Sequence, residues 1–238
     1  MYGWRGRIGL LVPANNSVIE PEIGRALPEG VCLYATRMLA RGDLTEAAIH
    51  AMEPQADRGV DELMATGVDL FAFADMVTTF VMPREWSERR TRQIAERTGR
   101  HCITAAGALW AALGVLGRRA LSIATPYPRR LHELVAPLFR DLGFAVVSHG
   151  TADILAMADV PRTPPQEVYR LARSICRPDT EILVILATDF RSFEVIDALE
   201  RDTGRPVVST NQALLWHALR TLGVAERIPG LGTLLRDH

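Results

Sequence analysis

The sequence repeats itself, and this repeat limits the fold more than any other feature does. Residues 7–13 (RIGLLVP) resemble residues 119–126 (RALSIATP), and the two final prolines lie 113 positions apart (126 − 13). Residues 68–75 (VDLFAFAD) resemble residues 180–189 (TEILVILATD), and the two final aspartates lie 114 positions apart (189 − 75). These matches indicate that the chain contains two copies of one structural unit.

A third match follows the same order. Gly99-Arg100 and Gly204-Arg205 each precede a short apolar run and a helix-like stretch that contains Leu-Trp and ends at Leu-Gly. Their offset is 105 positions (204 − 99). Chains that alternate strands and helices show some self-similarity by chance, but shared landmarks in one order favour a true duplication.

Apolar runs alternate with amphipathic stretches, a pattern that predicts strand–helix–strand units with parallel strands. Several runs are continuously apolar, as expected for strands covered on both faces. The expected strands are residues 7–12, 31–36, 68–74, 101–104, 120–124, 145–149, 181–187 and 206–209. The expected helices are residues 17–26, 45–65, 84–97, 107–116, 129–142, 165–176, 192–202 and 212–222, and residues 159–165 are expected to form a surface turn.

The predicted fold is therefore α/β, with two similar Rossmann-like halves that contain parallel sheets. A pseudo-twofold axis would relate the halves, and the active-site cleft would lie between them. We expect an N-terminal half at residues 1–117, onto which residues 210–238 can pack, and a C-terminal half at residues 118–238. The apolar helix at residues 107–116 favours assembly into a homo-oligomer, a dimer or a tetramer.

The composition excludes several classes of function. The chain has no lysine, so all 27 basic residues are arginine. Schiff-base chemistry and the phosphate-binding P-loop both require a lysine amine and are excluded. A net charge of −1 gives no reason to expect a nucleic acid or a membrane as a partner.

Metal and disulfide sites are not expected either. The three cysteines, Cys32, Cys102 and Cys176, are widely spaced, and the six histidines form no zinc-binding pattern. We therefore expect no metal and no cofactor. No apolar run approaches the ~20 residues of a membrane span, and the N-terminus does not resemble a signal peptide, so a cytoplasmic location is expected.

Asp75 and Asp189 are the strongest candidates for catalysis. Each ends a strongly apolar strand, and ligands of open parallel sheets bind beyond the carboxyl ends of the strands. The repeat would direct both side chains into one crevice from opposite sides. Two simpler roles are open: Asp189 as a cap of the helix near Ser192, and Asp75 as a turn residue before Thr78.

The chain resembles the maleate cis-trans isomerases, which belong with the arylmalonate decarboxylases to the aspartate/glutamate racemase superfamily. Residues 12–17 (VPANNS) are similar to the Pro-Ser-Ser-Asn-Thr entry of that branch, and residues 124–127 (ATPY) to its Thr-Pro-Tyr. Asn16 matches the substrate-binding asparagine of the family, and Tyr127 the tyrosine that contacts the substrate carboxylate.

The resemblance also places Asp75 and Asp189 where the family carries its two catalytic cysteines. An aspartate pair retains general acid–base chemistry but loses the covalent thioether-like intermediate proposed for maleate isomerases. Burial and mutual repulsion raise carboxyl pKa values, so one aspartate can be protonated while the other is ionised.

Other residues near the strand ends are candidates for binding the substrate. Hydroxyl, amide and backbone donors suit a carboxylate or an enolate oxygen. The predicted substrate-binding residues are Asn15, Asn16, Thr78, Thr79, Tyr127, Thr188, Phe190 and Asn211. Asn211 is also interpretable as a plain helix cap, and Arg191 as a structural or solvated residue or as a partner of Asp189 or of a substrate carboxylate.

These features predict a cofactor-independent isomerase or lyase that acts on a small carboxylate or dicarboxylate by two-sided proton transfer. A related alternative is decarboxylation of a malonate-like diacid, which requires an apolar pocket for the departing carboxylate. A hydrolase in which the carboxylates activate water, and a non-catalytic carboxylate-binding protein, are further alternatives.

Overall fold

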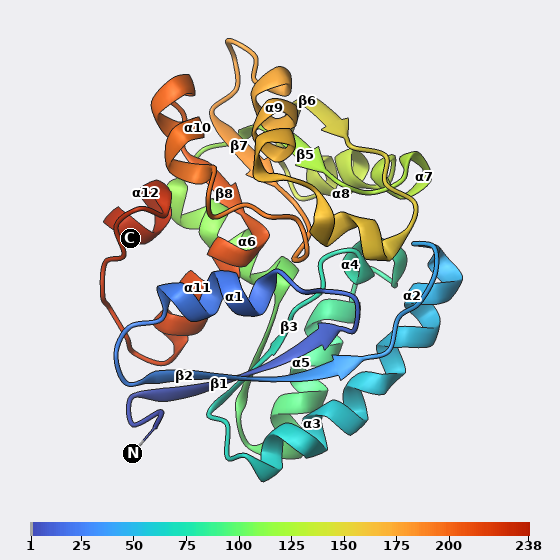
Figure 1. The fold of residues 1–238 in the computed structure, drawn as a ribbon, viewed down its shortest axis with the longest axis vertical. Helices are drawn as coiled ribbons and strands as arrows, with labels where there is room; N and C mark the ends of the chain where they lie inside the picture. Colours follow the sequence, from blue (N-terminus) through green and yellow to red (C-terminus); the bar gives the residue numbers. More distant parts are fainter. Residues whose placement is uncertain (1) are drawn as a thin grey trace.

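The computed structural model describes residues 2–238 and contains two four-stranded parallel sheets (Figure 1). The first sheet has the order β2-β1-β3-β4 and the second the order β6-β5-β7-β8, so each half repeats the same order. The strands are β1 (Gly6–Pro13), β2 (Val31–Met38), β3 (Leu70–Phe73), β4 (His101–Thr104), β5 (Ala120–Thr125), β6 (Ala145–Thr151), β7 (Ile182–Ile185) and β8 (Val207–Ser209).

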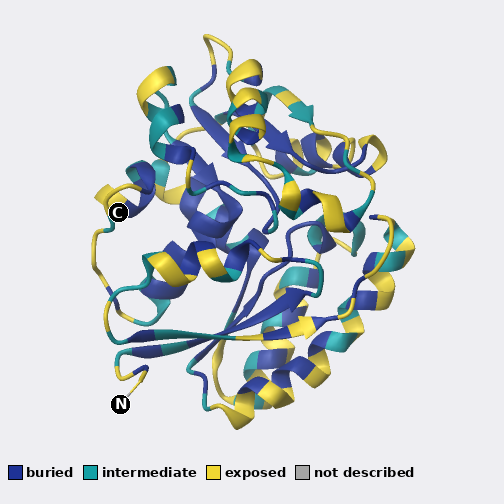
Figure 2. Ribbon diagram, in the orientation of Figure 1, coloured by how far each residue is buried: buried dark blue, intermediate teal, exposed yellow. Residues whose placement is uncertain are grey.

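Helices cover these sheets, and the buried residues lie along the strands and on the helix faces turned toward them (Figure 2). Among residues 2–238, none of the helices is long and apolar enough to span a membrane. The α-helices are α1 (Ile19–Ala26), α2 (Glu46–Met52), α3 (Ala56–Ala65), α4 (Thr78–Val81), α5 (Trp86–Thr98), α6 (Ala105–Leu116), α7 (Arg129–His132), α8 (Val135–Asp141), α9 (Pro165–Ile175), α10 (Ile196–Thr203), α11 (Thr210–Thr221) and α12 (Gly232–Asp237); the 3₁₀ helices are η1 (Glu53–Gln55) and η2 (Met157–Arg162).

The predicted α/β architecture with two similar halves is confirmed. Every residue of β3 and β7 is buried, which explains why these segments are continuously apolar. In each sheet the second strand lies on one side of the first strand and the third strand lies on its other side. The strand order therefore reverses between β1 and β3 in the first sheet and between β5 and β7 in the second. Such a reversal opens a crevice at the carboxyl ends of the two central strands.

Several predicted helix boundaries are wrong, for local reasons. The helix expected at residues 45–65 is divided by η1, where Pro54 cannot donate a backbone hydrogen bond. The helix expected at residues 129–142 is likewise divided into α7 and α8, with Pro137 in the first turn of α8. The helix expected from residue 192 begins at Ile196.

Three short elements were not predicted. Residues 159–165, expected to be a surface turn, fall mostly within the 3₁₀ helix η2. Helices α4 and α12 have only four and six residues, too few for a recognisable helical period.

The last helix of each half takes part in joining the two halves. Helix α6 follows the last strand of the first sheet and contacts β8 of the second sheet. Helix α11 follows the last strand of the second sheet and contacts α6, α1, β3 and β4. The domain boundary between residues 117 and 118 stays a prediction. Helices α6 and α11 each contact strands of both sheets.

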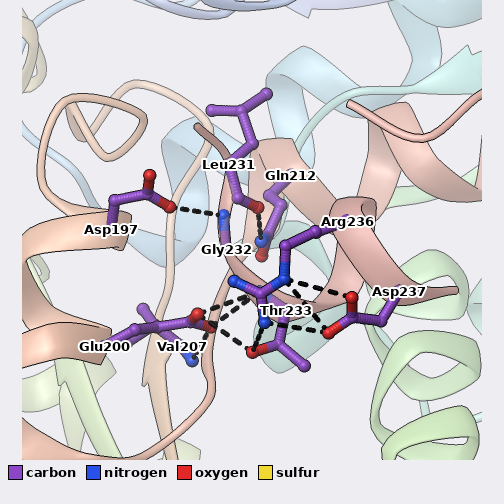
Figure 3. A network of polar contacts seen from close by, with 9 residues as sticks. All are labelled: Asp197, Glu200, Val207, Gln212, Leu231, Gly232, Thr233, Arg236 and Asp237. Carbon is purple, nitrogen blue, oxygen red and sulfur yellow. Dashed lines mark hydrogen bonds and ion pairs between the residues drawn. The ribbon is translucent and has the colours of Figure 1, made fainter. Parts of the chain in front are cut away.

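Carboxylates of α10 hold the C-terminal segment in place (Figure 3). Asp197 Oδ1 accepts a hydrogen bond from the Gly232 backbone N–H at 2.8 Å, and Glu200 accepts from the Val207 and Thr233 N–H groups at 2.9 Å. Gln212 Nε2 donates to the Leu231 carbonyl at 2.6 Å. Helix α12 is therefore fixed to both α10 and α11.

Gly232 is required at this junction. Its φ is +68°, and an added Cβ would lie 2.6 Å from Ile196 Cγ2 and 2.8 Å from Glu200 Oε1. We expect Gly232→Ala to lower the free energy of unfolding by about 1–3 kcal/mol, measured by urea denaturation. Gly114→Ala, at a helical position where a Cβ meets no atom within 4 Å, is the control and should raise stability by up to about 1 kcal/mol. Equal effects of the two substitutions would contradict this interpretation.

Candidate active site

The candidate site lies beyond the carboxyl ends of the four central strands. Asn15 follows β1, Asp75 follows β3, Tyr127 follows β5 and Asp189 follows β7. The two sheet reversals therefore bring one segment from each of these strands to the junction of the halves. All four residues line a single pocket.

This pocket is mostly apolar. Its volume is about 400 Å³, including the open mouth. The polar lining consists of Asn15, Asp75, Tyr127 and Asp189. The remaining lining residues are Pro13, Ala40, Leu44, Ile49, Met52, Val77, Met157, Val160 and Ala187.

Segments from both halves meet at the pocket. The Leu44 N–H donates to the Leu155 carbonyl at 2.8 Å, and the Met157 N–H donates to the Gly42 carbonyl at 3.1 Å. Leu44 and Met157 themselves line the pocket. The loop after β2 and the loop after β6 are thus joined where they contribute apolar surface.

Asp75 is buried and bound by its own half. Its Oδ2 accepts hydrogen bonds from the Thr78 backbone N–H at 3.2 Å and from the Thr78 hydroxyl. Burial raises the pKa of Asp75, and the hydrogen bonds from Thr78, Val77 and Met76 oppose that rise because they stabilise the ionised form. The simpler role considered for Asp75, a turn residue before Thr78, is thus also observed.

Asp189 is held by the other half. Asn15 Nδ2 donates to Asp189 Oδ2 at 3.1 Å and also to the Met157 carbonyl at 3.1 Å. Burial raises the pKa of Asp189 to about 7, and the negative charge of Asp75 adds to the rise. Asp189 does not cap a helix, because α10 begins seven residues later, at Ile196.

The backbone just before Asp189 adopts an unusual conformation. Ala187 has a φ of +88°, a region that non-glycine residues rarely occupy. Such a conformation costs on the order of 1–3 kcal/mol and persists only where neighbouring contacts enforce it. The Leu186 N–H donates to the Ala124 carbonyl at 2.9 Å, and the Thr188 hydroxyl donates to the Ala74 carbonyl at 3.0 Å. These bonds on both sides of Ala187 hold Asp189 at the pocket.

Tyr127 contributes an unpaired hydroxyl. The residue is buried, and its Oη has no hydrogen-bond partner among the described residues. Burial raises the pKa of Tyr127 well above its ordinary value, and the charges of Asp75 and Asp189 add to the effect. The phenol therefore remains protonated and can donate a hydrogen bond to a bound molecule.

Three of the predicted substrate-binding residues form hydrogen bonds between the halves. Asn16 Nδ2 donates to Thr188 Oγ1 at 3.0 Å, while Asn16 Oδ1 accepts from the Val18 and Ile19 N–H groups at the start of α1. Asn211 Nδ2 donates to Glu22 of the N-terminal half at 2.7 Å and to the Thr188 carbonyl at 2.9 Å. Asn16, Thr188 and Asn211 are buried, and substrate contacts by these side chains stay a prediction.

The other candidates are not among the residues that line the pocket. Thr78 is occupied with Asp75, and Thr79 Oγ1 is buried without a partner among the described residues. Phe190 is fully buried and borders a separate surface hollow. Arg191 pairs with Glu194 at 2.6 Å. No group of three or more metal-ligating side chains occurs within residues 2–238.

Sequence reasoning missed Glu22. This buried carboxylate of α1 accepts from the Ser192 N–H at 2.6 Å, the Phe193 N–H at 2.9 Å and Asn211 Nδ2 at 2.7 Å. It thereby fixes the segment just after Asp189 and the start of α11 to the N-terminal half. In a sequence, a glutamate near the start of a helix ordinarily indicates a favourable interaction with the helix dipole. Only the hydrogen-bond partners of Glu22 in the structure reveal that it joins the two halves.

The fold defines a class of α/β proteins in which two similar halves meet at a pocket, and here two aspartates line that pocket. Residues 8–235 match the model of the arylmalonate decarboxylase family. The chain therefore belongs to the arylmalonate decarboxylase family.

Relatives within this family are enzymes of two kinds. The chain is 28% identical to the maleate isomerase of Pseudomonas putida over 96% of both chains. It is 24% identical to the arylmalonate decarboxylase of Bordetella bronchiseptica, over 97% of this chain and 96% of that protein. The structure of Nocardia farcinica maleate cis-trans isomerase bound to Tris superposes with a TM-score of 0.91 at 28% identity, covering 98% of both chains. The predicted maleate isomerase and arylmalonate decarboxylase branch is confirmed.

We expect Glu22→Gln to loosen the junction of the halves. Glutamine offers one acceptor oxygen where Glu22 offers two, and its NH₂ group would face a donor. The free energy of unfolding should fall by about 1–3 kcal/mol in urea denaturation. Glu20→Gln, on the same helix but in a surface pair with Arg37, should cost at most about 1 kcal/mol. A larger loss in the Glu20 variant would contradict the role given to Glu22.

The buried carboxyl of Asp189 should make stability depend on pH. The folded protein keeps this proton up to about pH 7, whereas the unfolded chain loses it near pH ~4. Because the folded state then binds more protons, its stability falls as pH rises through this window. Relative to Asp189→Asn, the wild type should lose on the order of 2–4 kcal/mol between pH 4 and 7.5, measured by urea denaturation.

Asp141→Asn is the control for that experiment, since Asp141 is exposed and forms a surface ion pair with Arg84. Its unfolding free energy should follow the wild-type pH dependence. A constant difference between wild type and Asp189→Asn across the same pH range would show that Asp189 ionises as freely in the folded protein as in the unfolded chain.

Proposed function

We propose that this chain is a cofactor-independent isomerase or lyase that moves protons to and from a carbon next to a carbonyl group. Asp75 and Asp189 would act from the two sides of the pocket. Small carboxylates and dicarboxylates are the first substrates to test, because the relatives are named for maleate and arylmalonate. The observation that carries the proposal is one pocket lined by Asp75, Asp189 and the unpaired hydroxyl of Tyr127.

The environments of the two aspartates support different roles. Asp75 receives hydrogen bonds from Thr78 that favour its ionised form, which suits a general base. The charge of Asp75 contributes to raising the pKa of Asp189 to about 7, so Asp189 can hold a proton and act as the acid. Tyr127 would donate to the substrate oxygen on which negative charge develops.

The chemistry proposed differs from that of one relative. A mutant structure of Nocardia farcinica maleate cis-trans isomerase, 29% identical to this chain, contains a covalently bound succinylcysteine intermediate. Neither Cys32, Cys102 nor Cys176 of this chain lines the pocket. Burial also raises the pKa of the Cys102 thiol to about 12, which suppresses its thiolate form. Proton transfer by carboxyl groups is therefore the proposed route here.

Decarboxylation is the second candidate. The apolar lining, which includes Val77, Met157 and Val160, provides an environment that destabilises a substrate carboxylate and favours its departure as carbon dioxide. Release of carbon dioxide from a malonate-like acid would distinguish this reaction from isomerisation or racemisation.

Proton exchange tests the proposal directly. Candidate carboxylates are incubated with the protein in deuterated water, and loss of the proton next to the carboxyl group is followed by NMR. We expect Asp75→Asn and Asp189→Asn each to reduce exchange at least ~100-fold, the lower range for a general acid or base. Across pH, the rate should fall above about pH 7 as Asp189 loses its proton.

Asp202→Asn is the matched control, because Asp202 lies at the surface and binds Tyr169. This variant should exchange protons at the wild-type rate. Wild-type exchange rates in both pocket variants would contradict the assignment of Asp75 and Asp189.

A further inference from the structure

The turn that carries Tyr127 depends on neighbouring segments for its hydrogen bonds. Tyr127 lies between Pro126 and Pro128, neither of which has a backbone N–H to donate. The Ile154 N–H donates to the Pro126 carbonyl at 2.9 Å. The Thr151 hydroxyl donates to the Tyr127 carbonyl. Contacts that hold the end of β6 against the end of β5 therefore also hold Tyr127.

A set of three polar side chains makes such a contact. Thr125, the last residue of β5, is fully buried, and its hydroxyl lies 2.8 Å from His132 Nδ1. His132 Nε2 lies 2.8 Å from His149 Nδ1 on β6. His132 is buried, whereas His149 is exposed. The two histidines, called the histidine pair below, thus link α7 to both strands beside the Tyr127 turn.

The fold does not require polar side chains at these places. The repeat offset of 113 positions (126 − 13) and the register of the paired strands give the equivalent positions of the first half. They are Val12, Ile19 and Ala35 for Thr125, His132 and His149, respectively. Val12 and Ile19 are fully buried. Because burying polar groups costs free energy unless they are paired, stability alone does not explain the polar set of the second half.

The histidine pair can hold one added proton but not two. When both rings are neutral, one ring donates an N–H and the other accepts it. One added proton leaves this arrangement intact, because one ring nitrogen at the contact still has a lone pair. A second proton places two N–H groups against each other at the 2.8 Å contact, and the hydrogen bond is lost.

The surroundings decide which ring is protonated first. His149 is exposed, so water solvates its charge. Burial lowers the pKa of His132 to about 4, and the charge of His149 adds to the decrease, whereas Asp153 opposes it. Asp153 also pairs with Arg129 of α7 at 3.1 Å. The proton that breaks the pair is therefore the one that His132 accepts at acidic pH.

We propose that His132 is a positioning residue for Tyr127 and that the histidine pair is an acid-sensitive latch on the Tyr127 turn. Near neutral pH the latch is closed, and Tyr127 lines the pocket. At acidic pH the second proton breaks the hydrogen bond between the rings, and the turn opens reversibly. The latch does not depend on the reaction, but its effect on activity rests on the proposed function.

Hydrogen exchange of backbone amides tests the latch without a substrate. The Ala152 N–H donates to the Thr125 carbonyl at 2.9 Å, so its protection, like that of the Ile154 N–H, reports the closed turn. An opened turn frees His132 to bind a proton at its ordinary pKa. Protection of both amides should therefore fall about 10- to 100-fold between pH 6.5 and pH 4.5.

The first half supplies an internal control. The Ala14 N–H donates to the Met38 carbonyl at 2.8 Å, at the equivalent strand ends but without histidines. Its protection should change less than about 3-fold over the same pH range. An equal fall at Ala14 would show general acid unfolding and would overturn the latch.

Substitutions of the pair then identify the group that titrates. Asparagine can replace the hydrogen bond of a histidine Nδ1 but does not titrate in this range. His132→Asn should reduce the acid response to less than about 3-fold, and His149→Asn should weaken it at least about 3-fold because the repelling charge is gone. His217→Asn, at another histidine whose pKa burial lowers, is the control and should keep the wild-type response.

Two results overturn the inference. One is a wild-type protein without an acid response, and the other is a full response in His132→Asn. Where His132→Asn is too unstable to measure, His149→Asn decides, since this side chain is exposed, and a full acid response in it also overturns the latch.

Activity separates the latch from the proposed function. If the amides show the latch while Asp75→Asn and Asp189→Asn leave proton exchange of the tested carboxylates unchanged, the proposed function fails and the latch stands. If that exchange depends on both aspartates while the amides show no acid response, the latch fails and the proposed function stands. If both hold, exchange should fall between pH 6.5 and pH 4.5 at least about 3-fold more in the wild type than in His132→Asn.

Discussion

The hydroxyl of Thr188 joins the two halves at the point on which the site depends. It accepts a hydrogen bond from Asn16 at 3.0 Å and donates to the Ala74 carbonyl at 3.0 Å, so one buried atom connects the strand ends that carry both aspartates. Buried backbone groups at such a junction must find partners, because each unpaired group costs about 1–3 kcal/mol. The relative position of the two halves is therefore set next to Asp75 and Asp189, the two carboxyl groups of the pocket.

The same junction makes a repeated sequence chemically asymmetric. Asp75 is bound by Thr78 of its own half, whereas Asp189 is bound by Asn15 of the other half. The backbone also differs, because Ala187 has a φ of +88° and the equivalent Phe73 does not have a positive φ. Two cognate aspartates thus acquire different environments. The repeat accounts for two carboxyl groups at equivalent strand ends, and the unequal contacts give each carboxyl group its own environment.

The sequence predicted the fold well because its signals were local. Continuous apolar runs predicted the strands, and the repeat placed Asp75 and Asp189 at equivalent strand ends, where the pocket lies. The sequence favoured Asn16 over Asn15, but it is Asn15 that lines the pocket, since adjacent residues of one turn face different partners only once the second half is in place. Glu22 was missed for the same reason: its partners lie about 170 residues away, a separation at which periodicity carries no information.

Fold similarity and reaction are separate matters in this family. A TM-score of 0.91 with a maleate isomerase shows a shared fold, but the groups that line the pocket decide which reaction the pocket can support. In this chain the pocket presents two carboxyl groups, one phenol and apolar walls. Neither arginine nor histidine is among the residues that line the pocket, and Asp189 owes its raised pKa to burial and to the charge of Asp75. A further negative charge in this pocket would raise the pKa of both carboxyl groups, because like charges favour the protonated form.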